Sequence, residues 1–552
     1  MMREIDRRNF FRSSAAGLTG WAAVPEVSAL ASSLPAPYRT IYSNDTTNIL
    51  SCQRPEERSK EFSEHLLIAS IAEARGVDAH FLQPGLGWIP WWDSTVYSVE
   101  EHCRWLRDQF GIKGVKKIER FVLEGGDLLR TLVSTCRDIG VAPFLSFRLN
   151  DGHHVRDLKE ALERGKPTQS MARHYWENYE RFRIGPDPTR WEQGVFDWTF
   201  PEVRDYKFAL LEEACSRYDL AGVELDFLRH WSRFGESVPR DKRFEITTSF
   251  VQRVRAMLDC IEKEKGGSRR WLCVRVPANA EVRPDQGVDL RSLADAGVDM
   301  INLSYSYFTW QDGSVERARA EVGSGAAIYP EMTHTTMTGR ATSGSGTQPF
   351  LRTTDQQFYT TARLAYEQGA SGVSLFNFPY YRYHVTDSIG PFHEPPFHVL
   401  PRLADREFLK EQSSWYFLSS GRRDPVLGER VLPAILDRNI SSRFSLRMDS
   451  PGQPRKDGVL RLRSDETISD RTIEVRVNGV KLEPVEPIRK PLPHPYGETW
   501  IGKREELACY SFPASLAIRE TNQIEIVVRK GIRVRLIYLD VTIPGDPLES
   551  VA

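Results

Sequence analysis

Residues 222–230 predict a buried β-strand that carries two acids on one face; they read Gly222-Val223-Glu224-Leu225-Asp226-Phe227-Leu228-Arg229-His230. Side chains alternate along a strand, so Glu224 and Asp226 point to one side while Val223, Leu225 and Phe227 point to the other. Two carboxylates on one face of a core strand are costly unless they are hydrogen-bonded, protonated or used in chemistry. This strand is therefore the first candidate for the centre of a functional site.

Seven further apolar runs alternate with amphipathic helical stretches on either side of this strand. The eight expected strands are Thr40–Ser43, Val77–Leu82, Val141–Arg148, Ala221–Phe227, Trp271–Pro277, Val298–Tyr305, Ala326–Glu331 and Gly372–Phe378. Helices are expected at Glu56–Arg75, Val99–Phe110, Leu128–Ile139, Pro201–Tyr218, Ser249–Lys265 and Thr354–Gln368. The pattern predicts an α/β fold, a (β/α)8 TIM barrel over residues 38–400. A doubly wound sheet is the alternative, but no G-x-G-x-x-G motif or phosphate-binding glycine loop is present.

Polar residues follow or end these apolar runs. They are Asn44 and Asp45, Gln83, Arg148 with Asn150 and Asp151, Glu224 and Asp226, Arg275, Asn302, Glu331 and Asn377. In a parallel barrel the carboxyl ends of all strands meet at one end, which we call the barrel mouth, and barrel enzymes keep their chemistry there. The repetition over eight strands predicts a functional mouth.

The chain changes character after the expected barrel. Residues 401–430 are expected to form a helical linker. From about residue 442 apolar residues recur with period two, as in Phe444, Leu446 and Met448, and Asn478-Gly479 is a strong hairpin signal. These features predict an antiparallel β-sandwich accessory domain over residues 431–552.

The composition is that of a soluble globular protein with 40% hydrophobic and 27% charged residues. Its 74 basic and 75 acidic residues nearly cancel, so we expect no nucleic-acid partner. No stretch after the N-terminal region is long and apolar enough to span a membrane. The seven cysteines contain no C-x-x-C pair, which disfavours a disulfide framework or a structural zinc site.

The first 31 residues predict an export signal. Asp6-Arg7-Arg8-Asn9-Phe10-Phe11-Arg12 resembles the twin-arginine motif, an apolar run follows from Ala15 to Val24, and Ala29-Leu30-Ala31 suits signal-peptidase cleavage. We therefore expect the twin-arginine translocase as a partner during export, and a periplasmic or secreted protein.

Three acids are the candidate catalytic groups. Hydrolysis of a glycosidic bond needs one carboxyl group to protonate the leaving oxygen and another to attack or to activate water. Asp226 and Glu331 are the expected pair, on strands expected to lie opposite one another, and Glu224 is expected to modulate one of them or to act in its place. The alternative is that all three are structural ion pairs with Arg148, Arg229 or Arg275.

A family resemblance covers residues 196–230. Phe196-Asp197-Trp198-Thr199-Phe200-Pro201-Glu202-Val203-Arg204-Asp205-Tyr206, continuing through Ser216-Arg217-Tyr218-Asp219-Leu220-Ala221-Gly222 into the strand, resembles bacterial glycoside-hydrolase-like barrel proteins described as family-10-like. The resemblance implies a sugar-processing barrel, with Asp226 matching the acid of the fourth strand. The Asn-Glu pair of the large retaining glycosidase clan is absent, since Val223 precedes Glu224.

Substrate-binding residues are expected around these acids. They are Arg148, Asn150, Asp151, His153, His154, Arg229, His230, Arg275, Asn302, Tyr305, Asn377, Trp88, Trp91 and Trp92. The arginine at the end of the fourth strand would suit a carboxylated or sulfated sugar. The three tryptophans form either a sugar-stacking platform or a loop folded over the barrel edge. Asp151 with His153 and His154 is an alternative metal site, although a satisfied histidine pair is the commoner case.

The sequence thus predicts a glycoside hydrolase that cleaves an extracellular poly- or oligosaccharide with two carboxylates and without a cofactor or metal. The first alternative is a non-catalytic carbohydrate-binding barrel of a polysaccharide-utilisation system. The second is a metal- or cofactor-dependent enzyme, which the absence of H-E-x-x-H, C-x-x-C and a dinucleotide fingerprint disfavours.

Overall fold

The computed structural model describes residues 38–54, 61–86, 88–188, 190–337, 351–382, 394–418, 431–449, 456–490, 492, 502–518 and 520–545. Within these ranges no helix combines the length and the apolar character needed to cross a bilayer. The expected export signal at residues 1–31 lies outside the described residues, so twin-arginine export stays a prediction.

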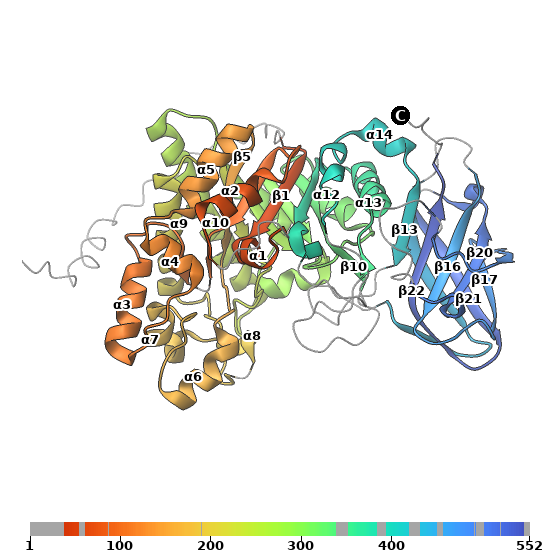
Figure 1. Ribbon diagram of the computed structural model, residues 1–552, viewed down its shortest axis with the longest axis horizontal. Coiled ribbons are helices and arrows are strands. Elements are labelled where there is room, and N and C mark those ends of the chain that lie inside the picture. Colours follow the sequence, from red (N-terminus) through yellow and green to blue (C-terminus); the bar gives the residue numbers. More distant parts are fainter. Residues whose placement is uncertain are drawn as a thin grey trace, which may run out of the picture. The chain divides into compact units, whose positions relative to one another are not determined.

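Eight parallel strands close into the barrel that the sequence predicts (Figure 1). Their order around the ring follows the chain, and the last strand pairs back with the first. They are β1 (Thr40–Asp45), β2 (Ala79–Gln83), β5 (Ala142–Arg148), β6 (Gly222–Asp226), β7 (Trp271–Pro277), β8 (Met300–Ser304), β9 (Ala327–Thr333) and β12 (Val373–Phe376). All eight apolar runs are therefore strands, and the prediction of a TIM-type barrel is confirmed.

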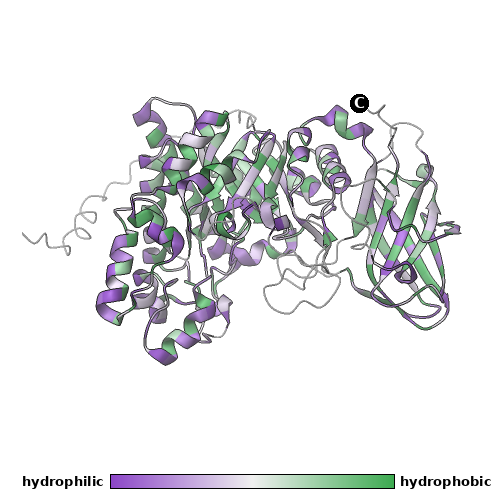
Figure 2. Ribbon diagram, in the orientation of Figure 1, coloured by the Kyte–Doolittle hydropathy of each residue, from purple (hydrophilic) through white to green (hydrophobic). Residues whose placement is uncertain are grey.

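Helices surround these strands and bury the outer face of the barrel wall. The main ones are α2 (Glu64–Ala72), α3 (Val99–Phe110), α4 (Lys117–Leu123), α5 (Leu128–Ile139), α9 (Pro201–Arg217), α10 (Arg240–Lys265), α11 (Leu290–Asp295), α12 (Ser314–Val322) and α13 (Asp355–Glu367). On β6, Val223 and Leu225 are fully buried in the same apolar cluster as Leu211 of α9. Figure 2 shows the hydrophobic colour on the central strands and mixed colours on the helices around them.

Long connections follow several strands at the barrel mouth. The loops after β1 and β5 hold short helices, and two-stranded antiparallel sheets follow β2 and β9. These elements are α1 (Thr46–Ser51), α6 (Leu158–Arg164), α7 (Arg173–Phe182), α8 (Trp191–Gly194), β3 (Gly85–Leu86) with β4 (Ile89–Pro90), and β10 (Thr335–Met337) with β11 (Leu351–Arg352).

Antiparallel strands form two sheets after the barrel, as the period-two pattern predicts. One sheet contains β13 (Ser414–Leu418), β22 (Val534–Ile543), β16 (Gly458–Ser464), β20 (Leu507–Phe512) and β19 (Pro484–Val485), with β14 (Ala434–Leu436) paired to β22. The other contains β15 (Ser441–Met448), β21 (Glu520–Lys530), β17 (Thr472–Val477) and β18 (Val480–Lys481). The Asn478-Gly479 turn joins β17 to β18 with positive φ at both residues, as such hairpins require.

The segment expected to be a helical linker supplies a strand to the C-terminal sheet and also contacts the barrel. Its helix α14 (Arg406–Glu411) is followed by β13, which pairs with β22 in the six-stranded sheet. The backbone N–H of Phe417 on β13 donates to Gln311 of the barrel (3.1 Å), and Arg363 of α13 donates to Ser414 (2.7 Å). The sheet region therefore begins near residue 414, because the apolar run Trp415–Leu418 needs a sheet partner to be buried.

All seven cysteines lie in the described part of the chain as unpaired thiols. Cys260 on α10 is exposed, Cys103 is partly buried, and the other five are buried. Burial raises the pKa of the Cys52, Cys136 and Cys215 thiols to about 12. The buried thiols behave as small apolar side chains.

Candidate active site

The two acids of β6 point into the barrel, as their spacing predicts. Glu224 is fully buried and accepts hydrogen bonds from Ser146 Oγ of β5 (2.8 Å) and Asn302 Nδ2 of β8 (3.1 Å). Asp226, two residues closer to the mouth, accepts from the backbone N–H groups of Leu228 (2.9 Å) and Arg229 (3.2 Å). The cost of placing two acids on one core strand is thus offset by hydrogen bonds from neighbouring strands and from the loop that follows.

Arg275 of β7 links Asp226 to Glu331 of β9. Its guanidinium donates to both Glu331 carboxylate oxygens (2.6 and 2.7 Å) and to Asp226 Oδ1 (3.2 Å). Glu331 also accepts from Ser304 Oγ and from Asn302 Nδ2 (3.4 Å). The ion pairs named as the alternative for Asp226 and Glu331 are therefore formed, and both involve one arginine.

The relative position of the acid-bearing strands differs from the prediction. β7 and β8 lie between β6 and β9, so these strands are three apart, and β12 is the strand opposite β6. The expectation that the acids face each other across the ring is therefore wrong. Arg275 and Asn302, which the sequence suggested as substrate ligands, occupy the two intervening strands and bridge the acids.

The pKa of Glu224 is raised in the folded protein. Burial, together with the nearby Asp226 carboxylate, raises the pKa of Glu224 to about 7, although Arg275, Asn302 and Ser146 oppose that rise. Its carboxyl group is therefore partly protonated near neutral pH, while Asp226 accepts three N–H donors. Two carboxyl groups on one strand face thus occupy contrasting environments.

A second ionic network lies on the β1 and β5 side of the barrel. Arg148 of β5 donates to Asp45 of β1 (2.5 Å) and to Asp151 (3.3 Å), and all three side chains are buried. Burial alone would raise the pKa of Asp45, but Arg148, Arg229 and His153 outweigh it and lower that pKa to about 2. Arg148 is thus held between carboxylates of the protein.

Three predicted residues remain partly exposed at the mouth: His153, Arg229 and His230. Arg229 donates to Tyr307 OH (2.5 Å) and contacts His153 Nε2, while His153 Nδ1 hydrogen-bonds Asp151. Burial lowers the pKa of both histidines, so both rings are neutral near pH 7. These side chains are the predicted ligands that a substrate can reach.

Two asparagines predicted as substrate ligands also connect loops of the barrel mouth. Asn150 donates to the backbone carbonyls of Phe196 (2.9 Å) and Ser232 (2.7 Å), and Asn377 accepts from Asn48 (2.7 Å). Both are buried, but within the described residues Asn150 Oδ1 and Asn377 Nδ2 have no hydrogen-bond partner, so their role as substrate ligands stays a prediction.

His154 and Tyr305 are buried against aromatic rings. The His154 ring packs against Tyr175, with ring centroids 4.0 Å apart. Tyr305 stacks on Trp310 at 5.0 Å, and its hydroxyl donates to Asp312. The metal alternative that used His154 is therefore not formed, because consecutive histidines point in different directions.

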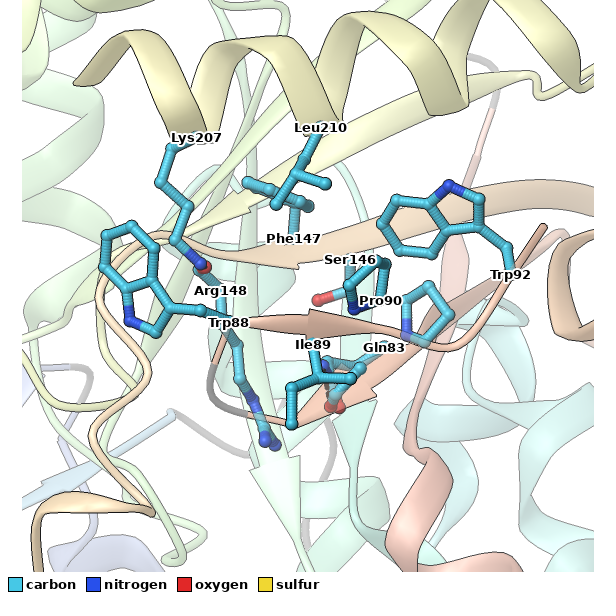
Figure 3. Close-up of a pocket in the computed structure, with 12 residues that line it drawn as sticks. Gln83, Trp88, Ile89, Pro90, Trp92, Ser146, Phe147, Arg148, Lys207 and Leu210 are labelled. Carbon is cyan, nitrogen blue, oxygen red and sulfur yellow. Dashed lines mark hydrogen bonds between the residues drawn. The ribbon is translucent and has the colours of Figure 1, made fainter. Parts of the chain in front are cut away.

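The tryptophans of the β2 loop form no open platform. Trp88, Trp91 and Trp92 are each 2% exposed, and the indole N–H of Trp92 donates to Glu213 (3.1 Å). In Figure 3, Lys207 of α9 extends toward Trp88, and its ammonium lies 4.0 Å from that ring. The pocket beside them has room for little more than one water molecule. The alternative of a loop folded over the barrel edge is the correct one.

Two tryptophans outside the predicted set of site residues lie beside His230. The Trp191 ring lies 5.1 Å from the His230 ring and 4.7 Å from the Trp231 ring, and both indoles are partly exposed. Trp231 could have been predicted as a site residue, because it directly follows Arg229 and His230 at the end of β6. Trp191 lies 40 positions before Trp231, and nothing in the sequence around it indicates that it belongs to the site.

Three residues shortly after barrel strands have positive φ angles without being glycine: His230 (58°) after β6, Ser306 (62°) after β8 and Asn377 (50°) after β12. A non-glycine residue in the left-handed region is strained unless its surroundings hold it there. Such positions cluster at functional sites. Two of the three, His230 and Ser306, are also partly exposed.

Comparisons with known proteins give weak likenesses. No family model matches the chain, and no curated protein matches it in sequence. A family 36 α-galactosidase from Geobacillus stearothermophilus in complex with raffinose shares 10% identity at a TM-score of 0.34, over 92% of this chain and 56% of that one. The chain therefore spans about half the length of that enzyme.

Two shorter structures align with about two thirds of the chain. The PgaB (BpsB) glycoside hydrolase domain from Bordetella bronchiseptica shares 10% identity at a TM-score of 0.38, over 67% of this chain and 99% of that one. A family 18 N-acetylglucosaminidase from Paenibacillus barengoltzii shares 12% sequence identity at a TM-score of 0.36. The alignment covers 66% of this chain and 99% of that one. The structural neighbours are thus described as glycoside hydrolases, while the barrel assignment rests on the strand pairing above.

Proposed function

We propose that this protein hydrolyses glycosidic bonds of a poly- or oligosaccharide at the barrel mouth, using two carboxyl groups. The observation that carries the proposal is the contrast between Glu224 and Asp226 on one strand face. A carboxyl group with a pKa of about 7 suits a proton donor, and a carboxylate supplied with N–H donors suits a base or nucleophile.

In this proposal Asp226 is the acid nearest the substrate and Glu224 is the proton donor. Glu331 is a positioning residue that acts through Arg275, since its two oxygens hold the guanidinium that also contacts Asp226. Arg229, Tyr307 and the Trp191–Trp231 pair would bind the sugar, because aromatic faces and guanidinium groups suit its rings and any acidic substituents.

The test is the release of reducing ends from neutral, uronic-acid and sulfated glycans. Wild type is compared with Asp226→Asn, Glu224→Gln and Glu331→Gln. We expect the first two variants to lose release, and Glu331→Gln to shift the pH profile while keeping measurable activity. Release that is unchanged in Asp226→Asn and Glu224→Gln would refute the assignment.

A second candidate is a non-catalytic carbohydrate-binding barrel. It is favoured by the engagement of Asp226 and Glu331 by Arg275, which leaves both acids paired within the protein. This candidate predicts glycan binding without cleavage, and binding that survives Glu224→Gln.

We also propose that the protein is exported through the twin-arginine pathway and acts outside the cytoplasm. The support is the Arg7-Arg8 motif with the apolar run and small residues that follow. Replacing Arg7 and Arg8 with Lys should retain the protein in the cytoplasm, as fractionation would show.

A further inference from the structure

Asp151, His153 and His230 form a compact cluster at the rim of the barrel mouth. One ligand atom from each lies within 4.8 Å of the other two. His230 Nδ1 is 3.7 Å from Asp151 Oδ1, which also accepts the hydrogen bond of His153 Nδ1, and the two imidazole rings are 4.8 Å apart. The cluster joins residues 77 positions apart in sequence, through the loop after β5 and the loop after β6.

The backbone of both loops is arranged to bring these side chains together. His230 has a φ of 58°, a strained value for this residue type. Gly152 packs directly beneath the His230 ring, because a Cβ at that position would lie 3.2 Å from it and 2.7 Å from Val195. Within the described residues, the buried Nδ1 atom of His230 has no hydrogen-bond partner. A strained residue that aims a buried, unpartnered nitrogen at a carboxylate indicates a missing ligand.

We propose that Asp151, His153 and His230 bind one divalent transition-metal cation. Two imidazoles and one carboxylate are the donors that zinc and iron(II) sites use, with further coordination positions left for water or substrate. Asp151 is anchored from behind by Arg148, which contacts its other carboxylate oxygen (3.3 Å) and so orients Oδ1 toward the histidines. The site does not depend on the proposed glycosidase activity.

The charges around the cluster are balanced before any cation binds. Asp45 and Asp151 supply two carboxylates, against the guanidinium groups of Arg148 and Arg229, while Asp226 is paired with Arg275. Arg229 contacts His153 Nε2, which accepts that hydrogen bond while Nδ1 carries the proton. Ligation through Nδ1 moves this proton to Nε2, so Arg229 must leave His153 when the cation binds, keeping its contact with Tyr307 (2.5 Å).

The experiment measures metal binding to the full folded chain. Chelator-treated protein is titrated with Co²⁺ and with Zn²⁺, and binding is followed by visible absorption of Co²⁺ and by calorimetry. We expect one ion per chain in wild type. Asp151→Asn and His153→Ala should weaken binding at least 100-fold, and so should His230→Asn, which keeps a residue tolerant of positive φ.

A matched control is His398→Ala. His398 hydrogen-bonds Asp355 (2.6 Å) and, like His153, is a histidine beside a carboxylate, but within the described residues it belongs to no three-ligand cluster. This variant should bind as wild type does. Circular dichroism and melting temperature establish that each variant is folded. Absence of stoichiometric binding in wild type, or equal affinity in wild type and folded His230→Asn, would overturn the proposal.

Discussion

Replacing Glu224 with Gln should stabilise the protein more at alkaline pH than at pH 5. Glu224 is fully buried, and its pKa in the folded protein is about 7 against an ordinary value of 4.5. A carboxyl group whose pKa is raised by folding contributes stability below its unfolded pKa and loses it as the pH rises through the folded pKa. The Gln side chain keeps the shape of the protonated acid but has no charge to bury.

The magnitude follows from the two pKa values. Each pKa unit corresponds to about 1.4 kcal/mol, so the raised pKa of Glu224 costs the fold roughly 3 kcal/mol at pH 8 and about 1 kcal/mol at pH 5. The advantage of Glu224→Gln should therefore grow by about 2 kcal/mol over this interval. A cooperative unit of about 500 residues gains roughly 1 kcal/mol of unfolding entropy per degree, so its melting temperature should rise by about 2 °C relative to wild type.

The assay is calorimetric melting of wild type and variant at pH 5, 6, 7 and 8. Glu212→Gln, the same change at an exposed position of α9, is the control and should melt with wild type at every pH. A difference between Glu224→Gln and wild type that stays constant from pH 5 to 8 would refute the reasoning, because the carboxyl group would then not titrate in this range.

Three further outcomes are expected. Arg275→Met leaves two buried carboxylates without their counter-ion, so urea denaturation should show that the free energy of unfolding falls by about 3–5 kcal/mol. Adding Glu331→Gln to the same chain should recover part of this loss, and a loss under about 1 kcal/mol would contradict the buried ion pairs. Trp231→Ala should weaken glycan binding about tenfold in a calorimetric titration, with a melting temperature within about 1 °C of wild type, and unchanged affinity would exclude this ring from the sugar site. Asn302→Ala removes a donor to Glu224, which should raise the pKa of that carboxyl group further; carboxyl titration by NMR would show a shift upward, and a downward shift would argue against the contact.

The barrel was predictable because each strand is a short apolar run followed by polar residues and then by an amphipathic helix. That pattern is local, and Trp271–Pro277 has the same bounds in sequence and structure. The direction of the β6 side chains was also predictable from the sequence. Val223 and Leu225 are buried on one side of the strand, so Glu224 and Asp226 must point to the other side, into the barrel interior.

The pairing among charged groups was not predictable, because it depends on which strands are neighbours and on side-chain reach. Arg275 was readable as a polar strand residue, but its simultaneous contact with Asp226 and Glu331 arises from the ring order. Similarly, nothing in the sequence tells His153 from His154. The loop geometry turns one toward Asp151 and the other toward Tyr175.

The unpaired cysteines allow unfolding of this protein to be followed by thiol labelling. Cys260 is the exposed thiol on α10, so a maleimide dye should modify the native chain there first, without any introduced cysteine. Cys52, Cys136 and Cys215 are enclosed and have thiol pKa values of about 12, so they should react only when the surrounding helices and strands separate. Counting labels per chain by mass spectrometry would therefore time local and global unfolding in the unaltered protein.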